Sequence, residues 1–252
     1  MPAPPPDGAF ATVPDGAFAT VPDGALAAVP AAGNRRALPM PARLTFCYGP
    51  MDCGKSTLAL QVNHNHARQG RQGLLLTRYD RSGGAAVTTR VGLSSEAIEV
   101  TDELDMRRLV LEHLALGHRI DYLIIDEAGF LNPEHVDQLA ELVDDYHVDV
   151  YCFGLLTDFR SQLLPGAKRL VELADEIAPV QVEVLCWCGR TGQQNARVVG
   201  GVVVREGDTV VVADTDGVSD RAAEVRYQVL CREHFRTGKL GRQPVGEQLT
   251  LG

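Results

Sequence analysis

One stretch decides the fold of this chain: Leu44-Thr45-Phe46-Cys47-Tyr48-Gly49-Pro50-Met51-Asp52-Cys53-Gly54-Lys55-Ser56. Its first five residues form an apolar run that is typical of a buried strand. The rest matches the pattern G-x-x-x-x-G-K-S, and the residues from 56 to about 69 read as a helix. A strand, a glycine loop and a helix in this order bind phosphate, because backbone N–H groups and the helix N-terminus converge on the phosphate oxygens. The stretch therefore predicts a nucleotide site, in which Lys55 reaches the β- and γ-phosphates and Ser56 ligates Mg²⁺.

Further strands and helices alternate beyond the loop. Strand patterns cover residues 74–77, 122–126 and 148–154, and helical spacing covers 106–116, 133–146 and 167–174, with Asn132 as the expected cap of the second of these helices. Residues 80–97 read as a loop with one or two short strands. This alternation predicts an α/β fold of the P-loop (RecA-like) class, a parallel sheet flanked by helices. After about residue 180, Val-rich strands and glycine turns predict a small C-terminal β-rich, zinc-ribbon-like domain.

The two ends of the chain differ from its centre. Residues 6–13 are repeated without change at 14–21 and with changes at 22–29. A repeat rich in Pro, Gly and Ala cannot bury a core, so residues 1–40 are expected to be a disordered tail. The expected domains are the P-loop α/β domain at 41–180 and the small β-rich domain with a lid at 181–238, followed by a tail at 239–252.

Composition excludes several classes of protein. The chain has 252 residues and a formal net charge of -9, which disfavours wrapping of nucleic acid. It has no apolar run of about 18 residues and no secretory signal pattern, so we expect a cytoplasmic protein without a membrane span. In a reducing compartment its six cysteines are not expected to form disulfides. Cys47 and Cys152 read as small buried hydrophobic residues.

An acidic pair, Asp126-Glu127, ends the apolar strand 122–126. In phosphate-loop proteins an acid at a strand end commonly holds Mg²⁺, and a neighbouring carboxylate can accept a proton from an attacking hydroxyl. The alternative is an acid pair that merely starts a turn or helix. The loop upstream favours the functional interpretation.

A second set of residues, Cys186-x-Cys188 with Cys231-x-x-His234, has the composition of a structural zinc site. Three thiolates and one imidazole fill a tetrahedral shell and leave no open position for catalysis. The second pair has a common ligand spacing, whereas the first is one residue tighter than usual. The alternative is two unrelated buried thiols.

Together these residues resemble the thymidine kinases of the cellular, tetrameric type (type II), and most of all the actinobacterial members. The resemblance runs from about residue 44 to 235. Residues 49–57 resemble the family's G-x-M-x-x-G-K-S-T loop, and 126–130 resemble its D-E-A-Q-F element. Residues 157–160 and 164–166 resemble the loop that closes over the nucleoside, and the Cys/His set resembles the zinc that staples that loop.

The resemblance implies transfer of the γ-phosphoryl group of ATP to the 5′-hydroxyl of thymidine, giving dTMP for nucleotide salvage. It implies that Glu127 is the base and that Asp126 assists Mg²⁺. It also implies feedback binding of dTTP and a homotetramer. The implied nucleotide site comprises Gly49, Pro50, Met51, Asp52, Cys53, Gly54, Lys55, Ser56, Thr57 and Asp126. The implied nucleoside site comprises Met51, Phe130, Leu155, Phe159, Asn195 and Tyr227, and Arg78 or Arg81 resembles an arginine near the phosphates.

One departure from the family pattern concerns the acceptor side. Gly129 stands where the family has Gln, so a side-chain contact is lost and backbone freedom is expected beside Glu127. Weakened activity is one expectation. Two other hypotheses stay open: a P-loop ATPase coupled to a protein or DNA partner, and an inactive nucleotide-binding paralogue.

Overall fold

The computed structural model describes residues 41–78, 86–89, 92–207 and 225–241. The chain divides into two units, Met1–Met40 and Pro41–Gly252, and all described residues belong to the second. The predicted repeat tail, Arg81 and most of the predicted C-terminal tail lie outside the described residues.

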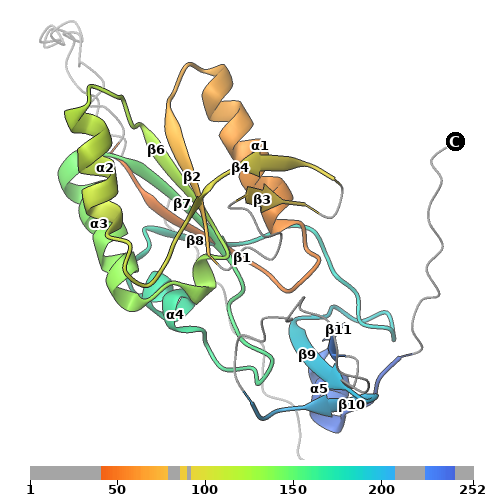
Figure 1. Ribbon diagram of the computed structural model, residues 1–252. Coiled ribbons are helices and arrows are strands. Elements are labelled where there is room, and N and C mark those ends of the chain that lie inside the picture. The colour runs from red at the N-terminus through yellow and green to blue at the C-terminus, as the bar shows by residue number, and fades with distance from the viewer. Residues whose placement is uncertain (1–40, 79–85, 90–91, 208–224, 242–252) are drawn as a thin grey trace, which may run out of the picture. The chain divides into compact units, whose positions relative to one another are not determined.

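A parallel sheet forms the centre of the described chain (Figure 1). Its strand order is β5-β2-β6-β7-β1-β8, and each neighbouring pair is parallel, which confirms the predicted α/β fold. Two strands were not predicted, because β5 is only two residues long and β8 is an edge strand without an apolar run. The strands are β1 (Leu44–Tyr48), β2 (Gly73–Thr77), β5 (Ile98–Glu99), β6 (Tyr122–Asp126), β7 (Asp149–Gly154) and β8 (Glu176–Pro179).

Helices cover both faces of this sheet, as Figure 1 shows. The central strand β6 is buried along its whole length, and its side chains alternate between the two faces. Leu123 and Ile125 pack in the cluster with α2, α3 and α4, whereas Tyr122 and Ile124 pack in the cluster with α1. The helices are α1 (Lys55–Arg68), α2 (Met106–Ala115), α3 (Pro133–Tyr146) and α4 (Pro165–Leu173), with a 3₁₀ turn, η1, at Ala128–Phe130.

The start of α4 and the cap of α3 differ from the sequence-based expectation. The fourth helix begins at Pro165 rather than 167, because proline suits the first turn of a helix. Asn132 occupies the N-cap position of α3, yet its side chain makes no cap hydrogen bond and instead donates to Asp102 Oδ1 at 3.0 Å. Asn132 therefore holds the predicted N-cap position, but its side chain does not make the capping hydrogen bond.

The C-terminal part carries its own small sheet. Strands β9 (Gln194–Val199), β10 (Val202–Val204) and β11 (Val225–Leu230) form an antiparallel sheet of order β10-β9-β11, as the predicted β-rich part requires. Helix α5 (Arg232–Thr237) adds His234 and Phe235 to its interior. A separate antiparallel pair joins β3 (Ala86–Thr88) to β4 (Ser94–Glu96). The domain boundary near residue 180 stays a prediction.

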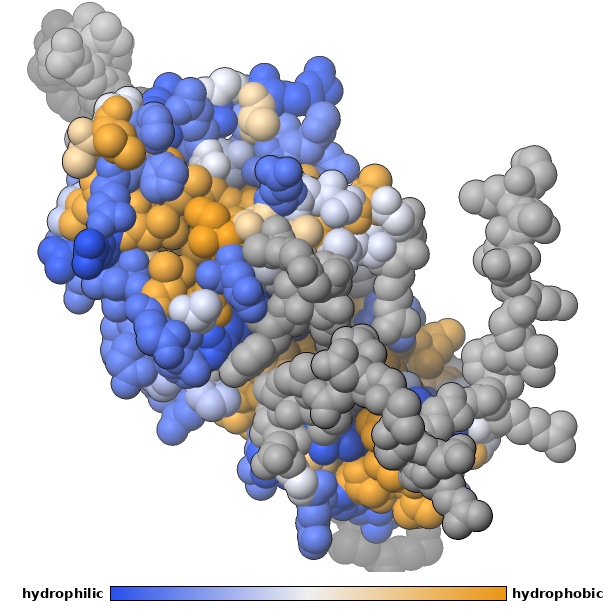
Figure 2. All heavy atoms as spheres, in the orientation of Figure 1, coloured by the Kyte–Doolittle hydropathy of each residue, from blue (hydrophilic) through white to orange (hydrophobic). Residues whose placement is uncertain are grey.

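The surface is mixed in character. Figure 2 shows hydrophobic side chains between hydrophilic ones on the face that carries α2. Leu116, directly after α2, is 75% exposed. None of the described helices combines the length and apolarity needed to cross a membrane.

Candidate active site and metal centre

The phosphate loop is a tight turn between β1 and α1. Gly54 has φ 81°, a left-handed conformation that side chains rarely adopt, and α1 starts at the next residue. A Cβ at Gly49 would lie 2.4 Å from Cys53 Sγ, so the buried thiol fills the inside of the turn. Lys55 is only 8% exposed, and its Nζ donates to the carbonyl of Pro50 at 2.8 Å. The first turn of α1 holds no acidic residue, so the positive end of the helix is not neutralised there.

Asp126 is the last residue of β6 and lies at the carboxyl end of the sheet, the same end as the phosphate loop. In the sheet, β7 lies between β6 and β1, and Gly49 N donates to Gly154 O at 3.3 Å. Asp126 is 4% exposed, and the Ser56 hydroxyl hydrogen-bonds its carboxylate. Burial raises the pKa of Asp126, against the opposing effects of that hydrogen bond and of the Lys55 charge.

The donor set at Asp126 fits Mg²⁺. Among the described residues, Asp126 Oδ1 is buried without a hydrogen-bond partner. Burial of a carboxylate oxygen without a hydrogen-bond partner costs free energy unless a metal ion or another group binds that oxygen. A hydroxyl and a carboxylate are oxygen ligands of the kind that Mg²⁺ prefers, and Ser56 and Asp126 provide both.

Glu127 stands beside this acid in a strained backbone conformation. Its φ is 54°, in the left-handed region that costs a non-glycine residue energy. Asp52 in the phosphate loop (φ 67°) and Ser161 in the segment between β7 and α4 (φ 62°) share this conformation. Among the described residues the only other non-glycine case is His147, at the C-cap of α3. Strain is thus concentrated in the loop, at the acid pair and in the segment after β7.

Gly129 is explained by close packing, not by backbone freedom. It lies outside the positive-φ glycines, and a Cβ there would sit 2.4 Å from the carbonyl oxygen of Leu155. A Cβ at Gly166 would likewise lie 2.6 Å from the carbonyl oxygen of Ala128. The turn η1 is therefore clamped between the residue after β7 and the start of α4. The clamp fixes the backbone directly after Glu127.

The segment between β7 and α4 is organised around one buried carboxylate. Asp158 is 6% exposed and accepts from Arg160 N at 2.8 Å, from Gln162 N at 3.0 Å and from Arg160 Nε at 2.7 Å. An isolated antiparallel β-bridge between Thr157 and Leu163 closes the segment into a hairpin-like loop. Charge-assisted bonds of this kind are about twice as strong as neutral ones, so the loop is pre-shaped.

The predicted nucleoside residues are joined in two groups. Asn195 Oδ1 accepts from the Met51 backbone N–H at 2.8 Å. Phe159 is 3% exposed, and it is linked to Tyr227 through Arg197, whose guanidinium lies 3.7 Å from the Phe159 ring centroid. Two further predicted residues, Phe130 and Leu155, are half-buried and pack against the larger core cluster.

Arg78, which resembles a phosphate-binding arginine, is held by contacts with Val100 and Asp102. Its side chain is 3% exposed, donates to the carbonyl of Val100 at 2.5 Å and pairs with Asp102. Asp102 also accepts from Asn132, so these contacts tie the end of β2 to the start of α3. The structure gives Arg78 a connecting role in the fold.

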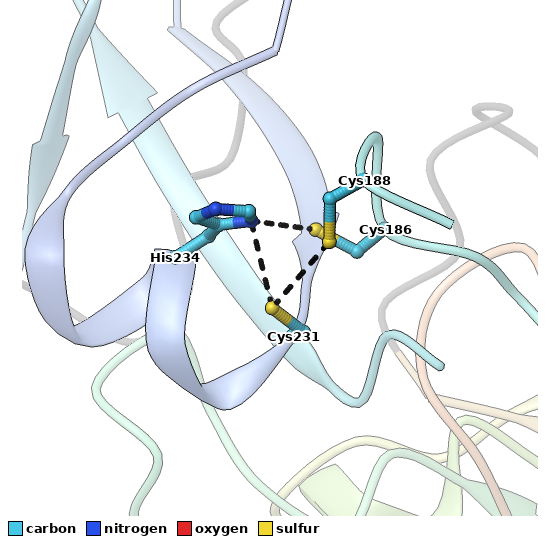
Figure 3. A group of neighbouring side chains, drawn as sticks. All are labelled: Cys186, Cys188, Cys231 and His234. Atoms are coloured by element: carbon cyan, nitrogen blue, oxygen red, sulfur yellow. Dashed lines mark hydrogen bonds between the residues drawn. The ribbon is translucent and has the colours of Figure 1, made fainter. Parts of the chain in front are cut away.

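The four predicted metal ligands converge at the base of α5 (Figure 3). His234 Nδ1 lies 3.3 Å from Cys186 Sγ and 3.5 Å from Cys231 Sγ, and the sulfurs of Cys188 and Cys231 are 4.0 Å apart. Bonds of about 2.3 Å at tetrahedral angles put two zinc-bound sulfurs about 3.8 Å apart, which is close to the separation of the Cys188 and Cys231 sulfurs. The four ligand atoms lie within 4.8 Å of one another and could hold a metal ion.

The surroundings of this cluster differ from ligand to ligand. A hydrogen bond from Arg190 lowers the pKa of the Cys188 thiol to about 6. Burial raises the pKa of Cys186. Trp187, between these two cysteines, stacks on the His234 ring at 4.2 Å with an interplanar angle of 18°. The arrangement favours one metal site over two unrelated buried thiols.

Sequence reasoning missed Arg197 as a candidate site residue. It is 4% exposed and lies on β9, two positions after Asn195. The only available signal was a cation within a run of buried strand residues, which demands a partner in the folded protein.

The sheet topology, the glycine loop and the buried acid beside it define this protein as a phosphate-loop nucleotide-binding protein of the α/β class. A family model described as thymidine kinase matches residues 42–235. The chain therefore belongs to the thymidine kinase family.

Relatives from actinobacteria are similar over nearly their whole length. The chain is 54% identical to the thymidine kinase of Cutibacterium acnes over 82% of this chain and 95% of that protein. It is also 54% identical to the thymidine kinase of Streptomyces coelicolor, over 77% of this chain and 88% of that protein. Among solved structures, the Pif1 helicase of Candida albicans is similar with a TM-score of 0.34 and 15% identity, over 55% of this chain and 36% of that one. A likeness this low carries no argument.

Proposed function

We propose that this kinase transfers the γ-phosphoryl group of ATP to the 5′-hydroxyl of thymidine, giving dTMP and ADP. The observation that carries the proposal is the 54% identity to the thymidine kinase of Cutibacterium acnes over 95% of that protein. The phosphate loop and the acid pair Asp126-Glu127, at the carboxyl ends of the strands, supply groups that suit phosphoryl transfer. The helicase-like likeness is too low to favour a DNA-coupled ATPase.

The nucleotide half of the proposed site is the loop from Gly49 to Thr57. Its backbone N–H groups and Lys55 bind the phosphates of ATP, while Cys53 fills the turn from inside. Ser56 and Asp126 would hold Mg²⁺, which when bound neutralises charge on the phosphates.

The acceptor half centres on Glu127. As the 5′-oxygen of thymidine bonds to the γ-phosphorus, the Glu127 carboxylate accepts the proton of that hydroxyl. The bond between the γ-phosphorus and the bridging oxygen breaks, and ADP leaves with the electron pair. The clamp on η1 supports this role by holding the Glu127 backbone in place. Residues proposed to contact the nucleoside are Met51, Phe130, Leu155, Phe159, Asn195 and Tyr227.

The remaining proposals concern organisation. The Cys/His set would hold a structural zinc, because all four positions of a tetrahedral shell come from side chains of this chain. We propose a kinase domain at 41–180 and a zinc-ribbon-like domain at 181–238. Inhibition by dTTP, a homotetramer and a cytoplasmic location are proposed from membership of the family.

The test compares the Glu127→Gln variant with the wild type in an assay of thymidine, ATP and Mg²⁺. Loss of a general base is expected to lower kcat by about a hundredfold to ten-thousandfold, with ATP affinity unchanged. The matched control is Glu134→Gln, because Glu134 is an exposed acid in the first turn of α3. Normal turnover in Glu127→Gln would remove this residue from its role.

The same assay separates the alternatives in the wild-type protein. ATP turnover that ignores thymidine but responds to DNA or to a protein would favour the coupled ATPase. Thymidine binding without product would indicate an inactive paralogue.

A further inference from the structure

Strand β9 presents two different faces to the rest of the protein. Side chains alternate along a strand, so Ala196 and Val198 share one face and Asn195 and Arg197 share the other. Ala196 packs in the C-terminal cluster with Leu230 and the two buried cysteines of the metal set. The opposite face makes contacts with residues of the α/β part.

Those contacts reach both halves of the candidate site. Asn195 accepts from the backbone of Met51 in the phosphate loop. Arg197 lies over Phe159, in the segment between β7 and α4, with its guanidinium carbon 3.7 Å from the ring centroid. Gln194, which begins the strand and by alternation shares the face of Ala196, also reaches that same segment, where it accepts from the hydroxyl of Ser161. One strand therefore touches the phosphate loop and the segment proposed to cover the nucleoside.

Arg197 makes a second aromatic contact within the C-terminal part. Its Nε donates to the Tyr227 hydroxyl at 3.1 Å, and its guanidinium carbon lies 5.8 Å from the centre of the Tyr227 ring. The Arg197 guanidinium thus contacts both Phe159 and Tyr227, which come from segments far apart in the sequence.

The burial of Arg197 argues that these contacts matter. Arg197 as a residue is 4% exposed, so its guanidinium loses most of its hydration, and this loss is costly unless protein groups replace the water. The faces of aromatic rings attract a planar cation, and the attraction grows when water is excluded. Phe159 is itself 3% exposed, so the contact between the two side chains is almost dry. Moving the guanidinium would disturb the position of both rings.

We propose that Arg197 is a positioning residue for the nucleoside: it sets the Phe159 and Tyr227 rings relative to one another and thereby determines thymidine affinity. The inference rests on the proposed function, because it assumes that these two rings face the nucleoside. The Arg197 guanidinium acts through the rings and takes no part in the transfer itself. Its loss should therefore affect thymidine and leave the phosphate loop unchanged.

The experiment measures KM for thymidine, KM for ATP and kcat for Arg197→Met and Arg197→Lys. Methionine keeps the length and removes the charge, so the thymidine KM is expected to rise about tenfold, with the ATP KM and kcat changed by less than about threefold. Lysine restores a cation over Phe159 without the planar fork, so the Arg197→Lys variant should lie between Arg197→Met and the wild type. Tyr227→Phe keeps the ring, removes the acceptor of Arg197 Nε, and should raise the thymidine KM in the same direction.

The matched control is Arg205→Met. Arg205 stacks on Phe235 at 4.5 Å within the C-terminal part, so this variant removes a similar contact outside the candidate site, and its thymidine KM should equal that of the wild type. A wild-type thymidine KM in folded Arg197→Met overturns the inference, as does an equal rise of both KM values. If Arg197→Met does not fold, a wild-type thymidine KM in both Arg197→Lys and Tyr227→Phe overturns it. A wild type that fails to phosphorylate thymidine defeats the proposed function itself, which is a distinct result.

Discussion

Gly129 shows how one missing side chain can be a requirement of packing. The family pattern has Gln at this position, and the sequence alone suggests a lost contact. In the structure the main chain of η1 comes so close to Leu155 that a Cβ would lie 2.4 Å from its carbonyl oxygen. The neighbour is backbone, so it cannot move aside as a flexible side chain would.

We therefore expect that Gly129→Gln does not restore activity but lowers it. A side chain at this position must displace η1 or Leu155, and with them Glu127, which should lower kcat about tenfold or more because small misplacements of a catalytic group are costly. Gly129→Ala should act in the same direction, since the first carbon of the side chain is the one that clashes. Steady-state kinetics on both variants check this. Higher turnover in Gly129→Gln would mean that the side-chain contact matters more than the packing.

For Glu127, the sequence predicts the chemical role of the residue but not its backbone conformation. Its position after an apolar strand and downstream of a phosphate loop was sufficient to predict it as a candidate base. Its left-handed backbone was not predictable, because that conformation is imposed by η1 and by the glycines packed around η1.

Among the elements, those with long periodic patterns were predicted best. The helices at Met106–Ala115 and Pro133–Tyr146 and the strand at Tyr122–Asp126 lie within one residue of their expected bounds. Strands β5 and β8 were missed, since a short strand at or near a sheet edge carries little apolar signal. The role of Arg197 on β9 was missed because its partners come from distant segments, which no local pattern reveals.

The metal set can be tested through a neighbouring side chain. Trp187 is the only tryptophan in the sequence, and it stacks on His234. Removal of zinc by a chelator should free the His234 ring, shift the Trp187 emission and release about one zinc per chain. Fluorescence and metal analysis before and after chelation, with zinc added back, measure this.

Variants at the cysteines provide the comparison. Cys188→Ser should show the emission of the chelated protein without any chelator, whereas Cys47→Ser, a cysteine of β1 outside the set, should keep the wild-type emission. Unchanged emission on removal of all metal would contradict the assignment of the four residues to one site.

For the molecule as a whole, two histidines link stability to pH. Burial, together with the charge of Arg78, lowers the pKa of His135. Burial and the charge of Arg71 likewise lower the pKa of His66. Both groups prefer the neutral form in the folded protein, so the unfolded chain binds more protons once the pH falls below about 6.5. Their contribution to stability is complete above that pH and declines below it.

We expect the two histidines to lower the thermal midpoint as the pH falls from 7.5 to 5.5. His135→Gln should reduce this dependence, and the part due to His66 should remain. Scanning calorimetry across the pH range measures both. A midpoint that rises on acidification, or a slope unchanged in His135→Gln, would contradict the assignment.

The contact between Asn195 and the Met51 backbone has a practical consequence for truncation. A fragment that ends near residue 180 would remove the acceptor of that N–H and uncover the Phe159 ring, which Arg197 now shields. Such a fragment would carry a loosened phosphate loop and a new apolar patch, and both favour aggregation over independent folding. Shortened versions of this enzyme should therefore retain β9 and β11, even where only the nucleotide half is wanted.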